Sequence, residues 1–376
     1  MTPTIIDGDG HVLEDPEAIS RFLPSPYREL GPFALSKLLP PLDHMHGQPF
    51  ELLPDAFGAG KPVGPDEWRA FMAFTGVQQA VLYPTWALAY GRMINPGWAV
   101  SVCRAYNDWL YDTYVSKDER FQGMALIPMQ EPASAVAELR RAVNELGFRG
   151  AMLPTNGLKG HLGSAEYFPI YEEAATLGCA IATHSGAHGD LGLDYLNPYA
   201  GVHALGHPFG TMISFAGMVL NGVFDRFDGL KVAYLEGGVA WLLMMLERLD
   251  RSYDTHKPYD PRGEFVRLRD GEHVSGYIKR KIAEGQLFIG CEGEEPTLGY
   301  AVKEVGETAF IFSSDYPHEV SPRTCKHEIE ELLETDELTP SAKEGILFRN
   351  AQQFYGLTTR LSTAAGASSR QTTSVG

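Results

Sequence analysis

Short apolar runs alternate along the chain with longer segments in which apolar residues recur every three or four positions. The first pattern is typical of buried strands and the second of amphipathic helices. After an N-terminal run at 4–6, further runs predict strands at 77–83, 121–127, 150–153, 179–183, 230–235, 287–291 and 309–313. The helical pattern occupies segments between and after them, at 96–115, 133–146, 169–177, 211–221, 239–253, 297–305 and 341–354.

Eight strands that alternate with helices predict an α/β fold of the (β/α)8 barrel type, also called a TIM barrel. A doubly wound open sheet would alternate in the same way. However, no GxGxxG sequence follows the first strand, as it does in the dinucleotide-binding version of that fold. We therefore expect residues 1–14 and 76–356 to form one barrel.

Two segments depart from this alternation. Residues 15–75 are rich in proline and glycine and weakly periodic, and structureless loops of such length are uncommon in compact domains. We expect them to form an inserted cap. Its His44 and His46 either approach a ligand or are surface residues without a functional role. Residues 357–376 consist largely of Ser, Thr, Ala and Gly, which predicts a disordered tail.

Composition narrows the range of partners. With 31 basic and 48 acidic residues, the net charge of −17 argues against binding to nucleic acid or to an anionic membrane surface. The four cysteines are widely spaced, so neither a disulfide framework nor a thiolate zinc site is expected. No signal peptide or membrane-spanning run is evident. We expect a cytoplasmic protein with a small-molecule substrate. The sequence does not decide between a monomer and a homo-oligomer.

Ionisable side chains follow five of the predicted strands. In a parallel barrel the carboxyl ends of all strands meet at one end, so these side chains should lie close together. The first strand carries two of them two residues apart, hence on one face. The set comprises Asp9, His11 and Glu14 after the first strand, His184 after the fifth, Glu236 after the sixth, Glu292 after the seventh, and Asp315 and His318 after the eighth.

Each of these residues has a purely local interpretation. Asp9 and Asp315 can hold turns, His184 can cap a helix, and Glu236 can pair with an arginine such as Arg149. All of them together would place a ring of carboxylates at one end of the barrel, where like charges repel and raise one another's pKa. A bound cation removes that cost, so the pattern favours a metal centre.

Four motifs are similar to those of a known family: Asp9-Gly10-His11, Thr183-His184-Ser185-Gly186, Glu236-Gly237-Gly238 and Ser314-Asp315-Tyr316-Pro317-His318. Through these motifs the sequence resembles the second amidohydrolase family, which includes the aminocarboxymuconate-semialdehyde decarboxylases and related aromatic-acid decarboxylases. The resemblance implies a barrel of amidohydrolase type with a metal ion held by Asp9, His11, His184 and Asp315.

Two departures from that family change the expected chemistry. Asp9 stands where the decarboxylases commonly carry His or Glu. Glu236 replaces the histidine that follows strand six and serves them as an acid/base group, and a glutamate is the better bridge between two cations. With Glu292 added, carboxylates outnumber imidazoles, as in carboxylate-bridged di-iron or di-manganese sites.

More narrowly, the chain is similar to the non-haem di-iron diterpenoid monooxygenases of platensimycin and platencin biosynthesis. This resemblance implies two iron ions, with catalytic roles for Glu236, Asp315 and His318. The implied metal ligands are Asp9, His11, His184, Glu236, Glu292 and Asp315. His203 and His207, between strands five and six, are either further ligands or loop histidines.

The sequence therefore supports more than one function. The favoured hypothesis is an O2-dependent monooxygenase of antibiotic biosynthesis that hydroxylates a bulky hydrophobic substrate, such as a diterpenoid acid or its coenzyme A thioester. The alternative is a mononuclear zinc or manganese hydrolase or non-oxidative decarboxylase of a carboxylic acid. A barrel that has lost activity and only binds a ligand is a third hypothesis.

Overall fold

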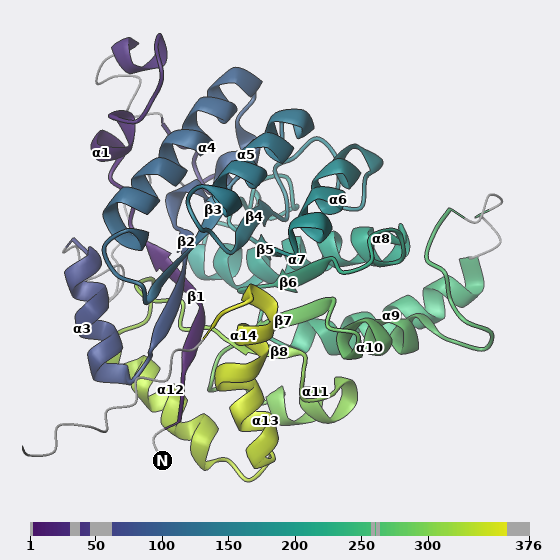
Figure 1. Ribbon diagram of the computed structural model, residues 1–376. Coiled ribbons are helices and arrows are strands. Elements are labelled where there is room, and N and C mark those ends of the chain that lie inside the picture. Colours follow the sequence, from purple (N-terminus) through teal and green to yellow (C-terminus); the bar gives the residue numbers. More distant parts are fainter. Residues whose placement is uncertain (1–2, 31–37, 46–61, 257–259, 261–263, 359–376) are drawn as a thin grey trace, which may run out of the picture.

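The computed structural model describes residues 3–30, 38–45, 62–256, 260 and 264–358 (Figure 1). Eight parallel strands follow one another in chain order around a single sheet. The strands are β1 (Ile6–Val12), β2 (Gln79–Pro84), β3 (Phe121–Leu126), β4 (Gly150–Pro154), β5 (Ala180–His184), β6 (Lys231–Tyr234), β7 (Leu287–Cys291) and β8 (Phe310–Phe312).

The two outer strands of this sheet meet and nearly close the barrel. The backbone N–H of His11 donates to the carbonyl oxygen of Tyr316 at 2.7 Å, and the N–H of Asp315 donates to that of Asp9 at 3.0 Å. In Figure 1 the purple β1 accordingly lies beside the yellow-green C-terminal region. Closure joins the start of the described chain to the segment after β8.

Helices surround the strands (Figure 1). The α-helices are α1 (Pro16–Ser20), α3 (Pro65–Thr75), α4 (Pro96–Leu110), α5 (Pro132–Asn144), α6 (Phe168–Leu177), α7 (Tyr199–Leu220), α8 (Val223–Arg226), α9 (Ala240–His256), α10 (Val274–Ala283), α11 (Leu298–Val305), α12 (Pro322–Glu334), α13 (Pro340–Glu344) and α14 (Asn350–Tyr355). Short 3-10 turns lie at η1 (Tyr27–Leu30), η3 (Trp86–Arg92) and η5 (Ala165–Tyr167), and π-turns at η4 (Tyr111–Val115) and η7 (Gly345–Arg349).

The strands are buried almost throughout, which explains why they read as continuous apolar runs rather than as alternating ones. Close packing requires glycine at one point of the sheet. Gly150 begins β4 with φ of +155°, and a Cβ there would lie 1.7 Å from the carbonyl oxygen of Ala180 on β5. The barrel expected from the sequence is confirmed.

One predicted helix is much longer in the structure. The helix predicted at 211–221 belongs to the longer α7, which begins at Tyr199 and continues through Pro208. Proline lacks an N–H and usually ends a helix, so the preceding residues read as a loop. The helix persists because it packs on the exit of β5, where Ser185 Oγ donates to the carbonyl oxygen of His207 at 2.9 Å.

The predicted cap at 15–75 is described only in part, as α1, η1 and α3, and stays a prediction. His46 lies outside the described residues, and so does the predicted tail after residue 358. Within the described part of the chain, no helix combines the length and apolar character needed to cross a bilayer.

Candidate metal centre

Strand β1 delivers two site residues, and the segment after β8 delivers two more. Asp7 ties these elements together, because its carboxylate accepts from Ser314 N at 3.0 Å and from Ser314 Oγ at 2.6 Å. The register between β1 and β2 shifts between Asp7 and Gly10. Asp9 and His11 are both buried, as expected for side chains that point into the end of the barrel.

The two strand histidines are oriented by hydrogen bonds to backbone oxygens. His11 donates its Nδ1–H to the carbonyl oxygen of Pro84 at 2.7 Å, and His184 Nδ1 lies 3.2 Å from that of Ser185. A carbonyl can only accept, so in both rings Nδ1 carries the hydrogen. The Nε2 atoms face Asp9 Oδ1, at 3.5 Å for His11 and at 3.2 Å for His184, which donates to this carboxylate when its ring is protonated. Metal-binding histidines are commonly held in this way.

These atoms fit a divalent cation. Asp315 Oδ1 lies 3.3 Å from His11 Nε2, which completes a set of two imidazoles and two carboxylates. Asp9 Oδ2 and His11 Nε2 are buried and have no hydrogen-bond partner among the described residues. Buried polar atoms of this kind are costly unless something satisfies them, and a cation between them does so. The residues present therefore suit a mononuclear metal site.

Glu236 lies beside this set and contacts three imidazoles. Its Oε2 is 2.8 Å from His184 Nδ1 and 3.1 Å from His207 Nδ1, and its Oε1 is 3.7 Å from His318 Nδ1. Glu236 and Asp315 both have φ of +54°, in the left-handed region that residues other than glycine rarely adopt. Such backbone conformations concentrate at functional sites, where the surrounding structure holds them.

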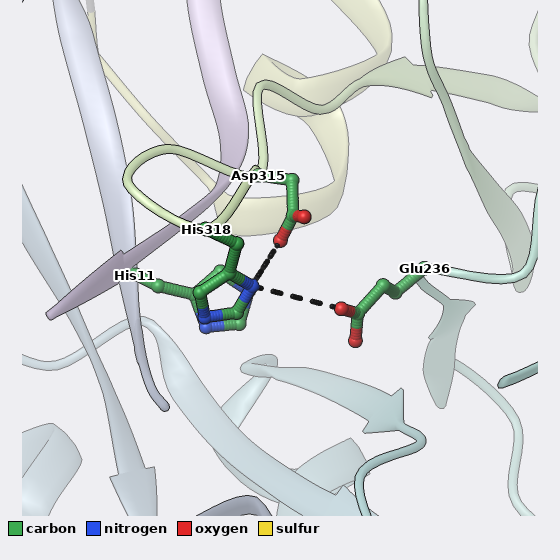
Figure 2. Close-up of side chains that lie close together, drawn as sticks. All are labelled: His11, Glu236, Asp315 and His318. Atoms are coloured by element: carbon green, nitrogen blue, oxygen red, sulfur yellow. Dashed lines mark ion pairs between the residues drawn. The ribbon is translucent and has the colours of Figure 1, made fainter. Parts of the chain in front are cut away.

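His318 connects Asp315 and Glu236 with the exit of β2. Figure 2 shows both carboxylates facing Nδ1 of its ring, with His318 Nδ1 2.7 Å from Asp315 Oδ1. On its other side, His318 Nε2 lies 3.0 Å from Thr85 Oγ1. Thr85 is fixed in turn by Glu14, whose carboxylate accepts from the backbone N–H groups of residues 85, 86 and 87 at 3.1, 3.1 and 2.8 Å.

Burial and mutual charge shift the pKa values of the site residues in opposite directions. Burial raises the pKa of Asp9, and burial with the neighbouring His318 and His184 lowers that of His11. Burial disfavours the charged forms of His318 and Glu236. In both residues the attraction of neighbouring opposite charges is the stronger effect. Asp315 and Glu236 raise the pKa of His318 to about 10, while His207 and His184 hold that of Glu236 well below its usual value. The cluster therefore gathers opposite charges in a buried volume.

The structure brings together most of the side chains expected from the sequence. Two groups have mutually close ligand atoms: Asp9, His11 and His184 in one, and His11, Glu236, Asp315 and His318 in the other. Glu292 belongs to neither group; it is exposed and lines a small cavity with Asp9, Glu236 and Asp315. Its role as a ligand stays a prediction.

The histidines that the sequence left open separate into different environments. His207 joins the centre through Glu236, whereas His203 has a side chain 40% exposed and lies 3.9 Å from Glu319. His44 Nε2 lies 2.8 Å from the carbonyl oxygen of Leu196. Sequence reasoning missed the roles of Thr85 and His188. Both follow strands, so a complete census of polar residues after each strand end would have included them.

The set of imidazoles and carboxylates that meet at the site differs from the set inferred from the sequence. Four imidazoles and three carboxylates converge, namely His11, His184, His207 and His318 with Asp9, Glu236 and Asp315. The expected excess of carboxylates counted Glu292 and left out His207. That ratio was the ground for choosing bridged iron over an imidazole-rich site, and the structure removes it.

The chain belongs to the amidohydrolase family Amidohydro_2, whose profile matches residues 36–357. It is 27% identical over 268 residues to a 2-amino-3-carboxymuconate-6-semialdehyde decarboxylase of Dictyostelium discoideum, covering 71% of this chain and 70% of that protein. It is 24% identical over 276 residues to a gamma-resorcylate decarboxylase of Polaromonas sp., covering 69% and 77%.

Solved structures of low sequence identity share the fold. The 5-carboxyvanillate decarboxylase of Sphingomonas paucimobilis superposes with a TM-score of 0.71 at 21% identity, covering 95% of this chain and all of that one. The enzyme of that name from Novosphingobium aromaticivorans, solved with manganese and 4-hydroxy-3-methoxy-5-nitrobenzoic acid, gives 0.70 at 17% identity, covering 95% and 97%.

These relatives correct the favoured functional prediction. They are decarboxylases of aromatic or related acids, and solved neighbours hold manganese. The expected O2-dependent di-iron monooxygenase, with its role in antibiotic biosynthesis, is therefore wrong, and nothing supports iron as the metal. The alternative that the sequence left open, a metal-dependent enzyme of the decarboxylase type, agrees with the relatives.

Proposed function

We propose that this protein is a metal-dependent decarboxylase of an aromatic or similarly conjugated carboxylic acid, with manganese as its ion. The observation that carries the proposal is the convergence of Asp9, His11 and His184 at the C-terminal end of the barrel, with Asp315 Oδ1 3.3 Å from His11 Nε2. Asp9 Oδ2 and His11 Nε2 are buried there without a hydrogen-bond partner among the described residues. Membership of the amidohydrolase family and the decarboxylases among its relatives support the reaction type.

In this proposal Asp9, His11, His184 and Asp315 hold the ion. When bound, the ion supplies positive charge that orients the acid group of the substrate and stabilises negative charge developing next to it. The protein excludes water from this position, because Asp9, His11, His184 and His318 are each at most 5% exposed. Exclusion of water strengthens each electrostatic contact in the site.

Decarboxylation breaks one C–C bond and leaves its electron pair on the carbon, which must then take up one proton as CO2 departs. His318 is placed to give that proton, because its ring is held between Asp315 and Glu236 on one side and Thr85 on the other. Glu236 also contacts His207, so it can pass a replacement proton from one imidazole to the other.

The test uses protein loaded with manganese under nitrogen and a panel of acids: gamma-resorcylate, 5-carboxyvanillate and their analogues. We expect CO2 release from at least one acid and about one bound metal ion per chain by elemental analysis. D315N should lose most of the metal and the activity, whereas D112N, at an aspartate on the surface turn after α4, should keep both. No CO2 from any acid of the panel, or turnover only with oxygen present, would overturn the proposal.

A further inference from the structure

One arginine at the C-terminal end of the barrel has no counterion in the part of the chain that the structure describes. Arg92 ends η3, between β2 and α4, and is partly buried. Among the described residues no carboxylate pairs with it and no oxygen accepts from it, although acidic residues outnumber basic ones 48 to 31 in this chain. A guanidinium offers five donors and no acceptor, so its natural partner is an anion.

Two glycines, in the loops after β4 and β5, leave room for the side chain of Arg92. A Cβ on Gly157 would lie 2.7 Å from Arg92 Cγ, and a Cβ on Gly189 would lie 2.5 Å from Arg92 Nη1 and 3.0 Å from Cζ. The aliphatic part of Arg92 therefore packs on the loop after β4 at Gly157, and its guanidinium group packs on the loop after β5 at Gly189. Any larger residue at either position would displace the side chain.

The element that carries Arg92 is held at both ends. Glu14 accepts from the backbone N–H groups at the start of η3, and Gln130 Nε2 donates to the carbonyl oxygens of Tyr90 and Gly91 at 2.9 and 3.2 Å. A charged side chain presented from such a fixed turn loses little freedom when it binds a ligand.

Two further polar side chains next to Arg92 have buried nitrogen atoms without a hydrogen-bond partner among the described residues. His188 precedes Gly189 and is 4% exposed, yet neither of its ring nitrogens has a hydrogen-bond partner among the described residues. Asn156 precedes Gly157, and its Nδ2 is buried without an acceptor in the same part of the chain. Unsatisfied buried groups in three adjacent segments indicate that something else completes them.

This group lies next to the metal centre. The ring of His188 is 4.7 Å from that of His207, which contacts Glu236. Gly206 on α7 makes room for that ring, because a Cβ there would lie 2.3 Å from His188 Cδ2. The three side chains thus continue the site from Glu236 toward the exits of β4 and β5.

We propose that Arg92, His188 and Asn156 form an anion-binding subsite that holds a second anionic group of the substrate, apart from the carboxyl group at the metal centre. The inference rests on the proposed function, since it assigns this anion to the same substrate. It narrows the substrate class to acids with a second carboxylate or an equally acidic oxygen group at the far end of the molecule.

The test is calorimetric titration of manganese-loaded protein with benzoate, isophthalate and biphenyl-4,4′-dicarboxylate, three probes that differ in the presence and distance of a second carboxylate. We expect at least one dicarboxylate to bind roughly tenfold more tightly than benzoate, the gain of one charged hydrogen-bonded pair. R92M and G189A should abolish this preference and leave benzoate affinity within about twofold.

R323M is the matched control, since Arg323 is an exposed arginine on α12, away from this subsite. It should keep the preference, and all variants should keep their metal content. Equal affinity of the wild type for all three probes, or a dicarboxylate preference that survives R92M, would refute the subsite. Failure of the proposed decarboxylase would show separately, as absent CO2 release, because this titration needs no turnover.

Discussion

At the residue scale, the gathering of the candidate ligands could be predicted because it depends on a simple rule. Side chains at the carboxyl ends of barrel strands share one end of the fold, so the closeness of Asp9, His11, His184 and Asp315 could be expected from the sequence, while their role as ligands stays a prediction. Arg92 and His188 could not. Their significance lies in missing partners, and only three-dimensional contacts show which polar atoms remain unsatisfied.

Thr85 offers the most direct test of the proposed role of His318, because its hydroxyl group lies 3.0 Å from His318 Nε2. T85V removes the hydrogen-bond partner of Nε2 while keeping nearly the same volume. We expect kcat to fall roughly tenfold with KM and manganese content little changed, the usual cost of one lost buried hydrogen bond.

T85S restores the hydroxyl group and should recover kcat to within about threefold of the wild type. Steady-state kinetics of the three proteins on whichever acid is turned over decides the matter. Equal impairment of T85S and T85V would mean that Thr85 acts through packing and not through His318.

At the element scale, α7 shows where pattern reasoning stops. Its first half contains glycines and Pro208, residues that predict a break, yet the helix continues because it docks on the exits of β4 and β5. That docking places His207 against Glu236. A local sequence pattern contains no information about this long-range contact, so the role of His207 stayed open.

The docking surface of α7 can be tested at Gly210. A Cβ there would lie 2.5 Å from Thr155 Oγ1 and 2.7 Å from Ser185 Oγ, two hydroxyl groups that are themselves 2.7 Å apart. We expect G210A to lower the free energy of unfolding by about 1–3 kcal/mol through overpacking, and to reduce activity because His207 shifts.

Gly201, in the first turn of the same helix, provides the matched control. A Cβ there meets only Leu196 Cδ1 at 3.4 Å, so G201A should be neutral or stabilise the helix by up to about 1 kcal/mol. Urea unfolding of both variants compares the two positions. Equal effects at the two glycines would contradict the docking argument.

At the scale of the whole molecule, the barrel was predicted correctly because its eight strands are short, buried and regularly spaced. The chemistry was not, because a count of candidate ligands along a sequence cannot say which of them meet. His207 was left open between a ligand and a loop histidine, and the structure places it against Glu236. The role of Glu292 as a ligand stays a prediction.

The metal should stabilise the entire fold, since its proposed ligands come from β1, β5 and the segment after β8. Saturation at 100 to 1,000 times the dissociation constant contributes about 3–4 kcal/mol. We expect chelation to lower Tm by several degrees in differential scanning calorimetry and added manganese to restore it. D315N should show little response to either treatment; an unchanged wild-type Tm would argue against a bound ion in the folded protein.

Closure of the barrel by its first and last strands has a consequence for how the protein is made. While a ribosome is still extending the chain, Asp9 and His11 have long been synthesised, but Asp315 and the Tyr316 carbonyl that receives the His11 N–H do not yet exist. Capture of the proposed cation would thereby wait until the segment after β8 has been synthesised. A polypeptide ended prematurely after β7 would lack Asp315 and could not assemble the complete proposed centre.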